Sequence, residues 1–417
     1  MRTTLIVFFV ILLIGCKLQK EDTSKAEIPT INLEKEYPIK RIDIHEIADV
    51  EYIPLETTDK SLLGNAAFSA ISENYIVIGD MKYFQILLFN RQGKYLRTIG
   101  KKGQGPGEYT NFEAFDVDFE KEEVYLYSLG LDQRMWIYSL NGKFKREFKY
   151  KYDDNNKKLD LKVLHSYDKD YLITYNDKYW PSPYPEYRRE ADKTPYYLIN
   201  KENGAMKIAH KKLVVPNPVP PYLDKMAKGS SGHYNWTVGY TIHYMVQNGS
   251  EFLLVDNGLD TLYTFEKHAL KPAMLRTPNT ATMKTKRFIS PCALTDRFFI
   301  YRRVILENDL HEQENIYYDK RKFPAYILDR KNKDIYQFEV YDSNISQELN
   351  LDSKLLTGFP GNGSFYSSTQ RNQVVSLYYL HQLKNKIDIN KTKGRFYNVY
   401  SKTKEDDNPI IVIYNFK

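Results

Sequence analysis

Residues 75–100 of the sequence read YIVIGDMKYFQILLFNRQGKYLRTIG, three short runs of aliphatic and aromatic residues separated by turn residues. Residues 123–148, EVYLYSLGLDQRMWIYSLNGKFKREF, repeat this pattern, and Gly142 lies 49 residues after Gly93. Each of these glycines follows a polar residue between two strand-like runs, which favours a tight hairpin because glycine accepts a positive φ. The repeat predicts consecutive copies of one β-unit.

Fainter copies of the unit follow, lengthened by insertions. They fall in residues 171–204, 251–265 and 298–338. A sixth copy is assembled from both ends of the chain, because residues 365–377 and 410–414 lack an outer partner that residues 50–55 can supply. We therefore predict an all-β fold: a six-bladed β-propeller of four-stranded antiparallel blades, closed by an N-terminal strand that joins the C-terminal blade.

The composition agrees with this fold class. The 417 residues include 36 Tyr and 21 Phe, and such flat rings pack well across a pleated sheet. The length alone would suggest two or three domains, but one repetitive architecture can take up residues 41–417 as a single domain. The net charge of +7 is spread over 60 basic and 53 acidic residues, without the concentrated basic stripe of a nucleic-acid-binding protein. We expect no nucleic-acid partner.

The N-terminus is typical of a lipoprotein signal peptide over residues 1–15. An apolar run ends in LIGC at residues 13–16, which resembles a bacterial lipobox. That resemblance implies cleavage before Cys16 and acylation of its thiol and new amino group, so that a lipid anchor makes the membrane a partner. An ordinary secretory signal that contains a cysteine is the alternative. Residues 16–40 are then the lipidated cysteine and a flexible tether.

Residues 19–22, QKED, resemble the export signal that sends some Gram-negative lipoproteins to the outer face of the outer membrane. The expected location is the cell envelope, as an outer-membrane lipoprotein, with surface exposure left open. Cys292 is the other cysteine of the chain, so we expect no intramolecular disulfide in the acylated protein and a core position for Cys292.

Four stretches carry a family resemblance: YIPLET at 52–57, the GK turn at 93–94, GQGPGEY at 103–109 and DDNPIIVIY at 406–414. With them the chain resembles the six-bladed β-propeller lipoproteins of Gram-negative envelopes, relatives of NHL-repeat propellers. The match spans nearly the whole mature chain and is weakest between residues 175 and 245, where blade boundaries stay open. The fold of those families is known, and their biochemical role is mostly unassigned.

Residues 100–109, GKKGQGPGEY, contain four glycines and raise the question of a phosphate-binding loop. Such a loop lies between a strand and a helix and carries a lysine beside Ser or Thr. Here the following residues, FEAFDVDF at 112–119, alternate like a strand. In the NHL-like pattern such a loop carries the chain from the outer strand of one blade to the inner strand of the next, so we interpret it as a structural turn.

The sequence contains no recognisable catalytic or metal-binding motif. The GxSxG, HExxH and CxxC patterns do not occur, and the eight histidines lack ligand spacing. Asp116 and Asp118 lie two apart, on the same face of a strand that can border the central channel. We predict no catalytic residue, no metal and no cofactor.

Two insertions are candidate ligand-binding segments because propellers bind through the loops of one face. The first combines rings and guanidinium groups suited to stacking and to carboxylate recognition. The second is proline-rich at its start and glycine- and serine-rich further on. The alternative is that both only cover the rim. The candidate ligand-binding residues are Trp180, Tyr184, Tyr187, Arg188 and Arg189 in the first, and His233 and Trp236 in the second.

Residues 374–387, VVSLYYLHQLKNKI, place apolar residues at helical spacing and predict a short helix that packs on the propeller. For the whole chain, we predict a lipid-anchored, non-catalytic envelope protein that binds or scaffolds a glycan, a peptide or a partner protein. The alternative is a propeller hydrolase or lyase with an active site at the channel mouth, since propellers host both kinds of function.

Overall fold

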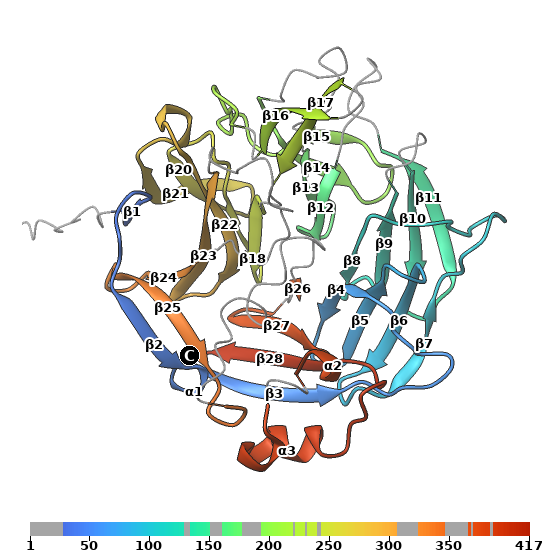
Figure 1. The fold of residues 1–417 in the computed structure, drawn as a ribbon. Coiled ribbons are helices and arrows are strands. Elements are labelled where there is room, and N and C mark those ends of the chain that lie inside the picture. Colours follow the sequence, from blue (N-terminus) through green and yellow to red (C-terminus); the bar gives the residue numbers. More distant parts are fainter. Residues whose placement is uncertain are drawn as a thin grey trace, which may run out of the picture.

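The computed structural model describes residues 28–128, 134–150, 161–176, 193–219, 222–229, 232–239, 243–306, 324–346, 366–367, 370–383 and 387–417. The described strands form a ring of sheets around a central axis (Figure 1). Six of these sheets are blades, which follow one another round the ring in sequence order. The described part of the chain therefore has the predicted six-bladed β-propeller fold.

In every blade the first strand lies nearest the axis, and neighbouring blade strands run antiparallel. Blade 1 contains β4 (Ala66–Ile71), β5 (Tyr75–Asp80), β6 (Gln85–Asn90) and β7 (Tyr95–Ile99). Blade 2 contains β8 (Ala114–Asp118), β9 (Glu123–Tyr127), β10 (Arg134–Ser139) and β11 (Phe144–Lys149). Blade 3 contains β12 (Leu161–Ser166), β13 (Tyr171–Asn176), β14 (Tyr196–Asn200) and β15 (Met206–Ile208).

The remaining blades follow the same plan. Blade 4 contains β18 (Met245–Asn248), β19 (Glu251–Leu254), β20 (Thr261–Glu266) and β21 (Ala269–Thr277). Blade 5 contains β22 (Lys286–Leu294), β23 (Phe298–Leu306), β24 (Ala325–Asp329) and β25 (Ile335–Tyr341). Blade 6 contains β26 (Tyr366–Ser367), β27 (Gln373–Tyr378), β28 (Ile410–Phe416) and β3 (Ala48–Pro54).

The middle strands are apolar on both faces because each blade packs against two neighbours. On β5, Val77 packs with Val124 of blade 2, whereas Ile76 and Ile78 pack with Ile411 of blade 6. Among the described residues, six such clusters of buried apolar side chains occur, one at each junction between consecutive blades. The core is therefore a ring of blade-to-blade contacts.

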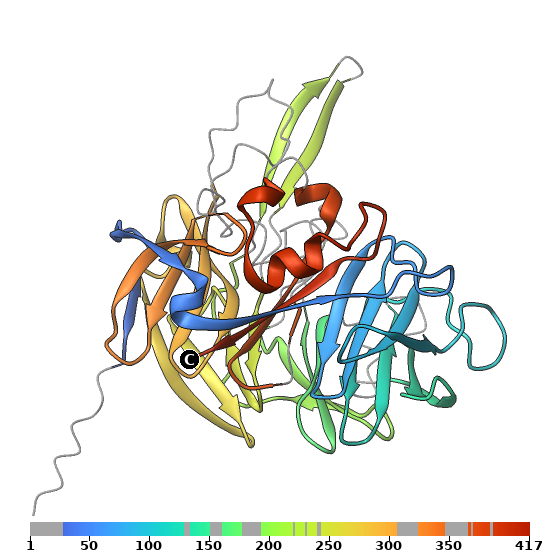
Figure 2. The ribbon, with the colours of Figure 1, turned by 90° about the horizontal axis from the view of Figure 1, so that it is seen from below.

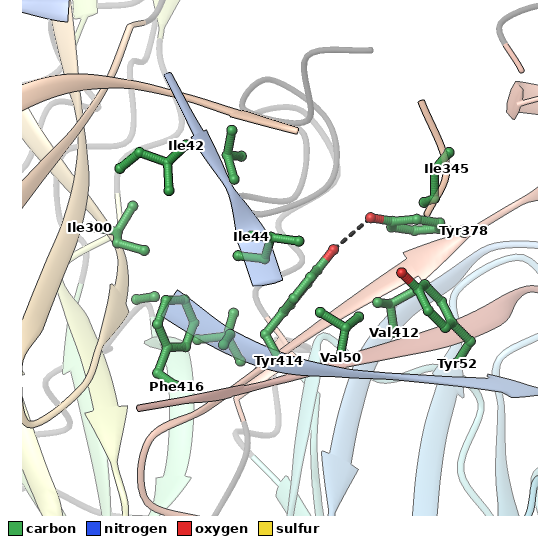
Figure 3. Close-up of a cluster of buried hydrophobic side chains, with 14 of the residues drawn as sticks. Ile42, Ile44, Val50, Tyr52, Ile300, Ile345, Tyr378, Val412, Tyr414 and Phe416 are labelled. Atoms are coloured by element: carbon green, nitrogen blue, oxygen red, sulfur yellow. Dashed lines mark hydrogen bonds between the residues drawn. The ribbon is translucent and has the colours of Figure 1, made fainter. Parts of the chain in front are cut away.

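The ring is closed as the sequence predicted, by an N-terminal strand in the C-terminal blade. The strand β3 pairs antiparallel with β28, with Ile410 opposite Pro54. Figure 3 shows side chains of both strands entering the cluster between blades 5 and 6, where the hydroxyl groups of Tyr378 and Tyr414 lie 2.5 Å apart. Closure therefore combines a full strand pairing with buried side-chain contacts.

A polar contact supports the same junction. The fully buried Asp342 carboxylate accepts a hydrogen bond from the Tyr52 hydroxyl and lies 2.8 Å from Nε2 of His45. His45 belongs to the short helix α1 (Ile44–Ile47), which Asp43 caps. The hydrogen bond to Asp342 raises the pKa of His45, against the effect of burial. These contacts tie blade 6 to the segment that follows β25.

The propeller begins before residue 41, where the sequence analysis placed the end of the tether. The strand β1 (Thr30–Asn32) pairs parallel with β21, and β2 (Ile39–Asp43) pairs parallel with β25. Both add a fifth strand to the rim of a blade. The boundary was wrong because Ile31 and Leu33, set among polar residues, are fully buried between blades 4 and 5.

The helix predicted over residues 374–387 begins as a strand. Residues 373–378 form β27, because pairing with β28 outweighs the local spacing, and among the described residues of this range α2 (Leu380–Leu383) is the helical part. Leu380, Leu383 and Ile387 are nevertheless buried against the propeller, as expected. Besides α1 and α2, the helical segments of the described ranges are η2 (Thr280–Thr282), η3 (Ile389–Lys391) and α3 (Gly394–Tyr400). Within the described ranges, no helix is long and apolar enough to cross a membrane.

The hairpin glycines found in the sequence do more than turn the chain. Gly93 and Gly142 adopt φ values of 83° and 89°, and each turn lies against the outer strand of the preceding blade. A Cβ atom on Gly93 would lie 2.1 Å from the carbonyl oxygen of Pro54, and one on Gly142 would lie 2.9 Å from that of Thr98. Glycine is therefore required both by the turn and by the close approach of two blades.

We predict that Gly93→Ala destabilises the protein much more than Gly249→Ala. Both glycines have a positive φ, but a Cβ on Gly249 would meet its nearest atom, in Arg371, at 3.5 Å. The control substitution should cost about 1 kcal/mol for the backbone conformation, and Gly93→Ala about 3 kcal/mol because the blades must also move apart. Urea denaturation measures both values. Equal losses would contradict the role of this turn as a blade-to-blade contact.

Candidate binding face and pocket

The connections between strands divide the molecule into two unlike ends. The chain reverses direction after each of the four antiparallel strands of a blade. The connections between the first and second and between the third and fourth strands therefore lie at one end, and the other connections lie at the opposite end. At one end, the short-turn end, they are residues 72–74, 91–94, 119–122, 140–143, 167–170, 201–205, 249–250, 267–268, 295–297, 330–334 and 368–372. At the other, the loop-rich end, the strand ends are separated by the longest stretches of sequence, which are residues 55–65, 100–113, 150–160, 177–195, 209–244, 307–324, 342–365 and 379–409.

The connection from blade 3 to blade 4 contains a separate two-stranded hairpin. Its strands are β16 (Tyr222–Gly229) and β17 (Gly232–Gly239), and Figure 2 shows them standing out from one face of the ring. His233 and Trp236 lie on β17, opposite Lys228 and Lys225 respectively. This part of the second insertion, proposed from sequence as a binding segment, is therefore a β-hairpin.

A pocket of about 950 Å³ lies at the junction of blades 1 and 2. The glycine-rich connection supplies residues 103–108 and 110–111 to its wall. Blade 2 supplies the rest of the wall, from the strand ends that border the loop-rich end and from the outer strand. These residues are Ser128, Arg134, Trp136, Phe144 and Glu147.

These side chains of blade 2 line the pocket because successive side chains along a strand point to opposite faces of the sheet. In β10, Met135 and Ile137 pack toward blade 3, so Arg134 and Trp136 face blade 1. Trp136 is only partly buried, and it lies opposite Glu147 of β11. Nη1 of Arg134 lies 2.7 Å from Oε1 of Glu147. One face of the outer half of the blade thus presents an indole ring beside an ion pair.

The glycine-rich connection is braced by its own hydrogen bonds. The amide of Gly103 donates to the carbonyl of Tyr109 at 2.9 Å, and the amide of Glu108 donates to that of Gly105 at 3.0 Å. The Glu108 carboxylate accepts from the Gly105 amide at 2.9 Å and pairs with Lys101 at 2.7 Å, which lowers the pKa of Glu108. The wall of the pocket is therefore preformed.

Two buried tyrosines fix this connection to blade 2. The Tyr138 hydroxyl donates to the carbonyl of Gly107 at 2.8 Å, and the Tyr138 ring meets the buried Tyr109 ring edge to face. No helix follows the glycines, since the next element is the inner strand β8. The interpretation as a structural turn between an outer and an inner strand is confirmed, and the same turn also forms a pocket wall.

The paired aspartates near the axis are occupied by contacts with blade 3. The Asp116 carboxylate accepts a hydrogen bond from the amide of Ser166, and burial raises its pKa to about 7. Oδ2 of Asp118 lies 2.6 Å from Nζ of Lys201, which is fully buried and also donates to the Asp168 carbonyl at 2.6 Å. Both carboxylates therefore join inner strand β8 to the third blade.

Two histidines enclosed by the ring form a second polar group with Arg302. Burial lowers the pKa of His165 to about 4. Burial and the charge of Arg302 lower the pKa of His243 to about 3, so both imidazoles are neutral at pH 7. Cys292 is buried between blades 5 and 6, as predicted, and burial raises its pKa to about 12. Nowhere in the described ranges do three His, Cys, Asp or Glu side chains gather as metal ligands.

The residues proposed from sequence lie largely outside the part of the chain that the structure describes. Cys16 and the first insertion, with Trp180, Tyr184, Tyr187, Arg188 and Arg189, fall there. The insertion lies in the connection between β13 and β14, whose strand ends border the loop-rich end. These residues, with His233 and Trp236, remain predicted ligand-binding positions.

The pocket residues were missed by the sequence analysis. Trp136 and Phe144 were assigned to the second repeat and treated only as strand residues. The sequence does contain a signal for these residues: they lie in the outer half of a blade, next to a connection rich in glycine. Side chains alternate along RMWIYS, so once Met135 and Ile137 are placed in the core, Trp136 and Tyr138 must point toward that connection.

Comparison with known proteins places the chain in a family. A family model described as a domain of unknown function, DUF4934, matches residues 28–415, and the chain belongs to that family. No curated protein matches the sequence. Among solved structures, the chain is similar to a candidate exported protein from Bacteroides fragilis, with a TM-score of 0.58 and 15% identity over 93% of this chain and 99% of that one.

Two further solved structures are similar at lower scores. A member of the DUF4221 family from Bacteroides vulgatus has a TM-score of 0.45 and 9% identity, over 89% of this chain and 97% of that one. A protein of unknown function from Bacteroides thetaiotaomicron has a TM-score of 0.40 and 10% identity, over 91% of this chain and 75% of that one. At these identities, the similarities concern the fold.

Proposed function

We propose that this DUF4934 protein is a non-catalytic binding protein of the cell envelope, anchored by a lipid on Cys16, that takes a ligand at its loop-rich end. The observation that carries the proposal is the concentration of long connections at one end of the ring, one of which walls a pocket against blade 2. Functional residues concentrate on such loops because a rigid scaffold positions them. A glycan, a peptide or a partner protein is the expected ligand.

Two observations support the envelope location. Residues 13–16 have the pattern of a lipobox, and the similar Bacteroides fragilis protein is a candidate exported protein. The lipobox and the QKED stretch at residues 19–22 favour an outer-membrane lipoprotein. In this proposal, the residues between the lipidated Cys16 and the first rim strand, which begins at Thr30, form the tether.

A hydrolase or lyase with its site at the axis receives less support. Asp116 and Asp118 each accept a hydrogen bond from blade 3, which leaves them as contacts between blades. Burial lowers the pKa of His165 to about 4, and burial with the charge of Arg302 lowers that of His243 to about 3, so neither imidazole carries a proton to donate at pH 7 as an imidazolium acid. Binding is therefore the function that the described residues favour.

The anchor predicts opposite behaviour for the two cysteines of the chain. Cys16→Ala should abolish labelling by radioactive palmitate and move the protein from the membrane to the soluble fraction, because acylation needs that thiol. Cys292→Ala is the matched control and should keep both label and membrane location, since Cys292 is buried in the propeller. Labelling that persists in Cys16→Ala would contradict lipidation at this residue.

The binding role predicts that the two ends of the molecule respond differently to substitution. A variant with Trp180, Arg188 and Arg189 all changed to Ala should bind at least about tenfold more weakly to ligands found on an array of envelope glycans and peptides. The control, Lys169→Ala with Lys331→Ala, changes exposed residues in short turns and should bind normally. Equal losses in both variants would overturn a ligand site at the loop-rich end.

A further inference from the structure

We propose that the pocket between the glycine-rich connection and blade 2 binds a short, uncharged oligosaccharide. This inference rests on the proposed binding function and assigns a ligand class to the pocket that one of the long connections walls. Three properties of the pocket carry it: a ring surface, paired charges, and a wall that hydrogen bonds hold rigid.

The ring surface comes from Trp136 and Phe144. The Phe144 side chain is 42% exposed, and Trp136 is partly exposed on the pocket wall. An exposed aromatic ring at a cavity offers an apolar face, and the axial C–H groups of a pyranose ring form a matching flat apolar face. Planar aromatic rings also give contact area at low cost in side-chain entropy. A sugar ring is a ligand that can use this surface and still present hydroxyl groups at its edge.

The charges at the pocket argue for an uncharged ligand. The Glu108 carboxylate is paired with Lys101, and Glu147 is paired with Arg134, each at 2.7 Å. A charged ligand would have to break one of these pairs or approach a carboxylate of its own sign. An ion pair still offers both donors and acceptors at its edge, which suits a hydroxyl group because a hydroxyl both donates and accepts.

The remaining polar groups have the same mixed character. The connection adds the amides of Gln104 and Asn111 and the hydroxyl of Thr110, and blade 2 adds the hydroxyl of Ser128. The Ser128 hydroxyl donates to Oδ1 of Asn111 at 3.1 Å, which orients that amide toward its neighbour. Such short polar groups beside a ring form the pattern expected for an array of sugar hydroxyls, which need several donors and acceptors close together.

Size and rigidity complete the argument. A cavity of about 950 Å³ is at the upper end of the range of about 300–1,000 Å³ for small-molecule pockets, so it accommodates several sugar units and not only one. The Glu108 carboxylate lies over Gly103 and Gly105 and accepts a hydrogen bond from the Gly105 amide, and the Tyr138–Gly107 hydrogen bond fixes the connection to blade 2. A preformed wall lowers the entropy cost of binding.

The test is calorimetric titration of the purified chain lacking residues 1–15 and the lipid, with cellohexaose, laminarihexaose, chitohexaose and hexagalacturonate as probes. We expect at least one neutral hexasaccharide to bind, with an affinity that does not change between low and high NaCl. Hexagalacturonate, which carries a carboxylate on every unit, should not bind. Binding of hexagalacturonate alone, weakened by salt, would overturn the assignment to an uncharged ligand, as would a failure of all three neutral probes.

Variants then place the site. Trp136→Ala and Phe144→Ser should each weaken binding at least about tenfold, whereas Tyr397→Ala, which removes an exposed ring on α3, should leave it unchanged. Phe144 is exposed, so its variant tests the site even where Trp136→Ala unfolds the blade. Normal binding by the folded Phe144→Ser and Trp136→Ala proteins would overturn the pocket as the site.

Fluorescence gives an independent readout, because the chain contains three tryptophans. Emission of the otherwise unchanged chain should shift to shorter wavelength when the bound sugar excludes water from Trp136, and this shift should be absent in Trp136→Phe. Binding lost in the Trp180, Arg188 and Arg189 variant but kept in Trp136→Ala would reject this pocket and keep the proposed function. Binding that neither set of variants affects would reject both.

Discussion

Burial of both faces of every blade is the constraint on which the rest of this structure depends. A strand such as β5, with Ile76 facing blade 6 and Val77 facing blade 2, has no solvent-tolerant face. A row of such blades would leave two apolar surfaces exposed at its ends, and only a closed ring removes them. The pairing of β3 with β28 is therefore a condition for burying the clusters on either side of blade 6.

The same constraint places the residues that stabilise the fold and the residues that can bind a ligand in different parts of the molecule. Because the hydrophobic contacts lie between blades, the connections at the ends are free to vary in length without opening the core. At the short-turn end, glycines such as Gly93 bring one blade onto the next, so length there is restricted. At the loop-rich end, the connections are long, and one of them forms a pocket with Trp136. The binding role that we propose follows from this asymmetry between the ends.

Much of the fold could be predicted from the sequence because the determinants are local and repeated. The spacing of Gly93 and Gly142 indicates the length of the repeating β-unit. The strand-like run at residues 410–414 lacks a partner in its own repeat, which predicts pairing with residues 50–55. The rim strand β1 could not be predicted in this way. Its few apolar residues stand in a polar segment, and they form a strand only by pairing with β21 at the edge of blade 4. The pocket was missed for a similar reason: it forms between two repeats, and the pattern within one repeat does not contain it.

Closure of the ring is the central claim, and native-state hydrogen exchange tests it most directly. The account predicts that backbone amides in the β3–β28 pairing exchange only through global unfolding, with the same free energy of opening as amides in β5 and β6. It would be contradicted if β3 and β28 exchanged at a free energy several kcal/mol lower while β5 and β6 stayed protected. The ring would then be stable without its closing strand.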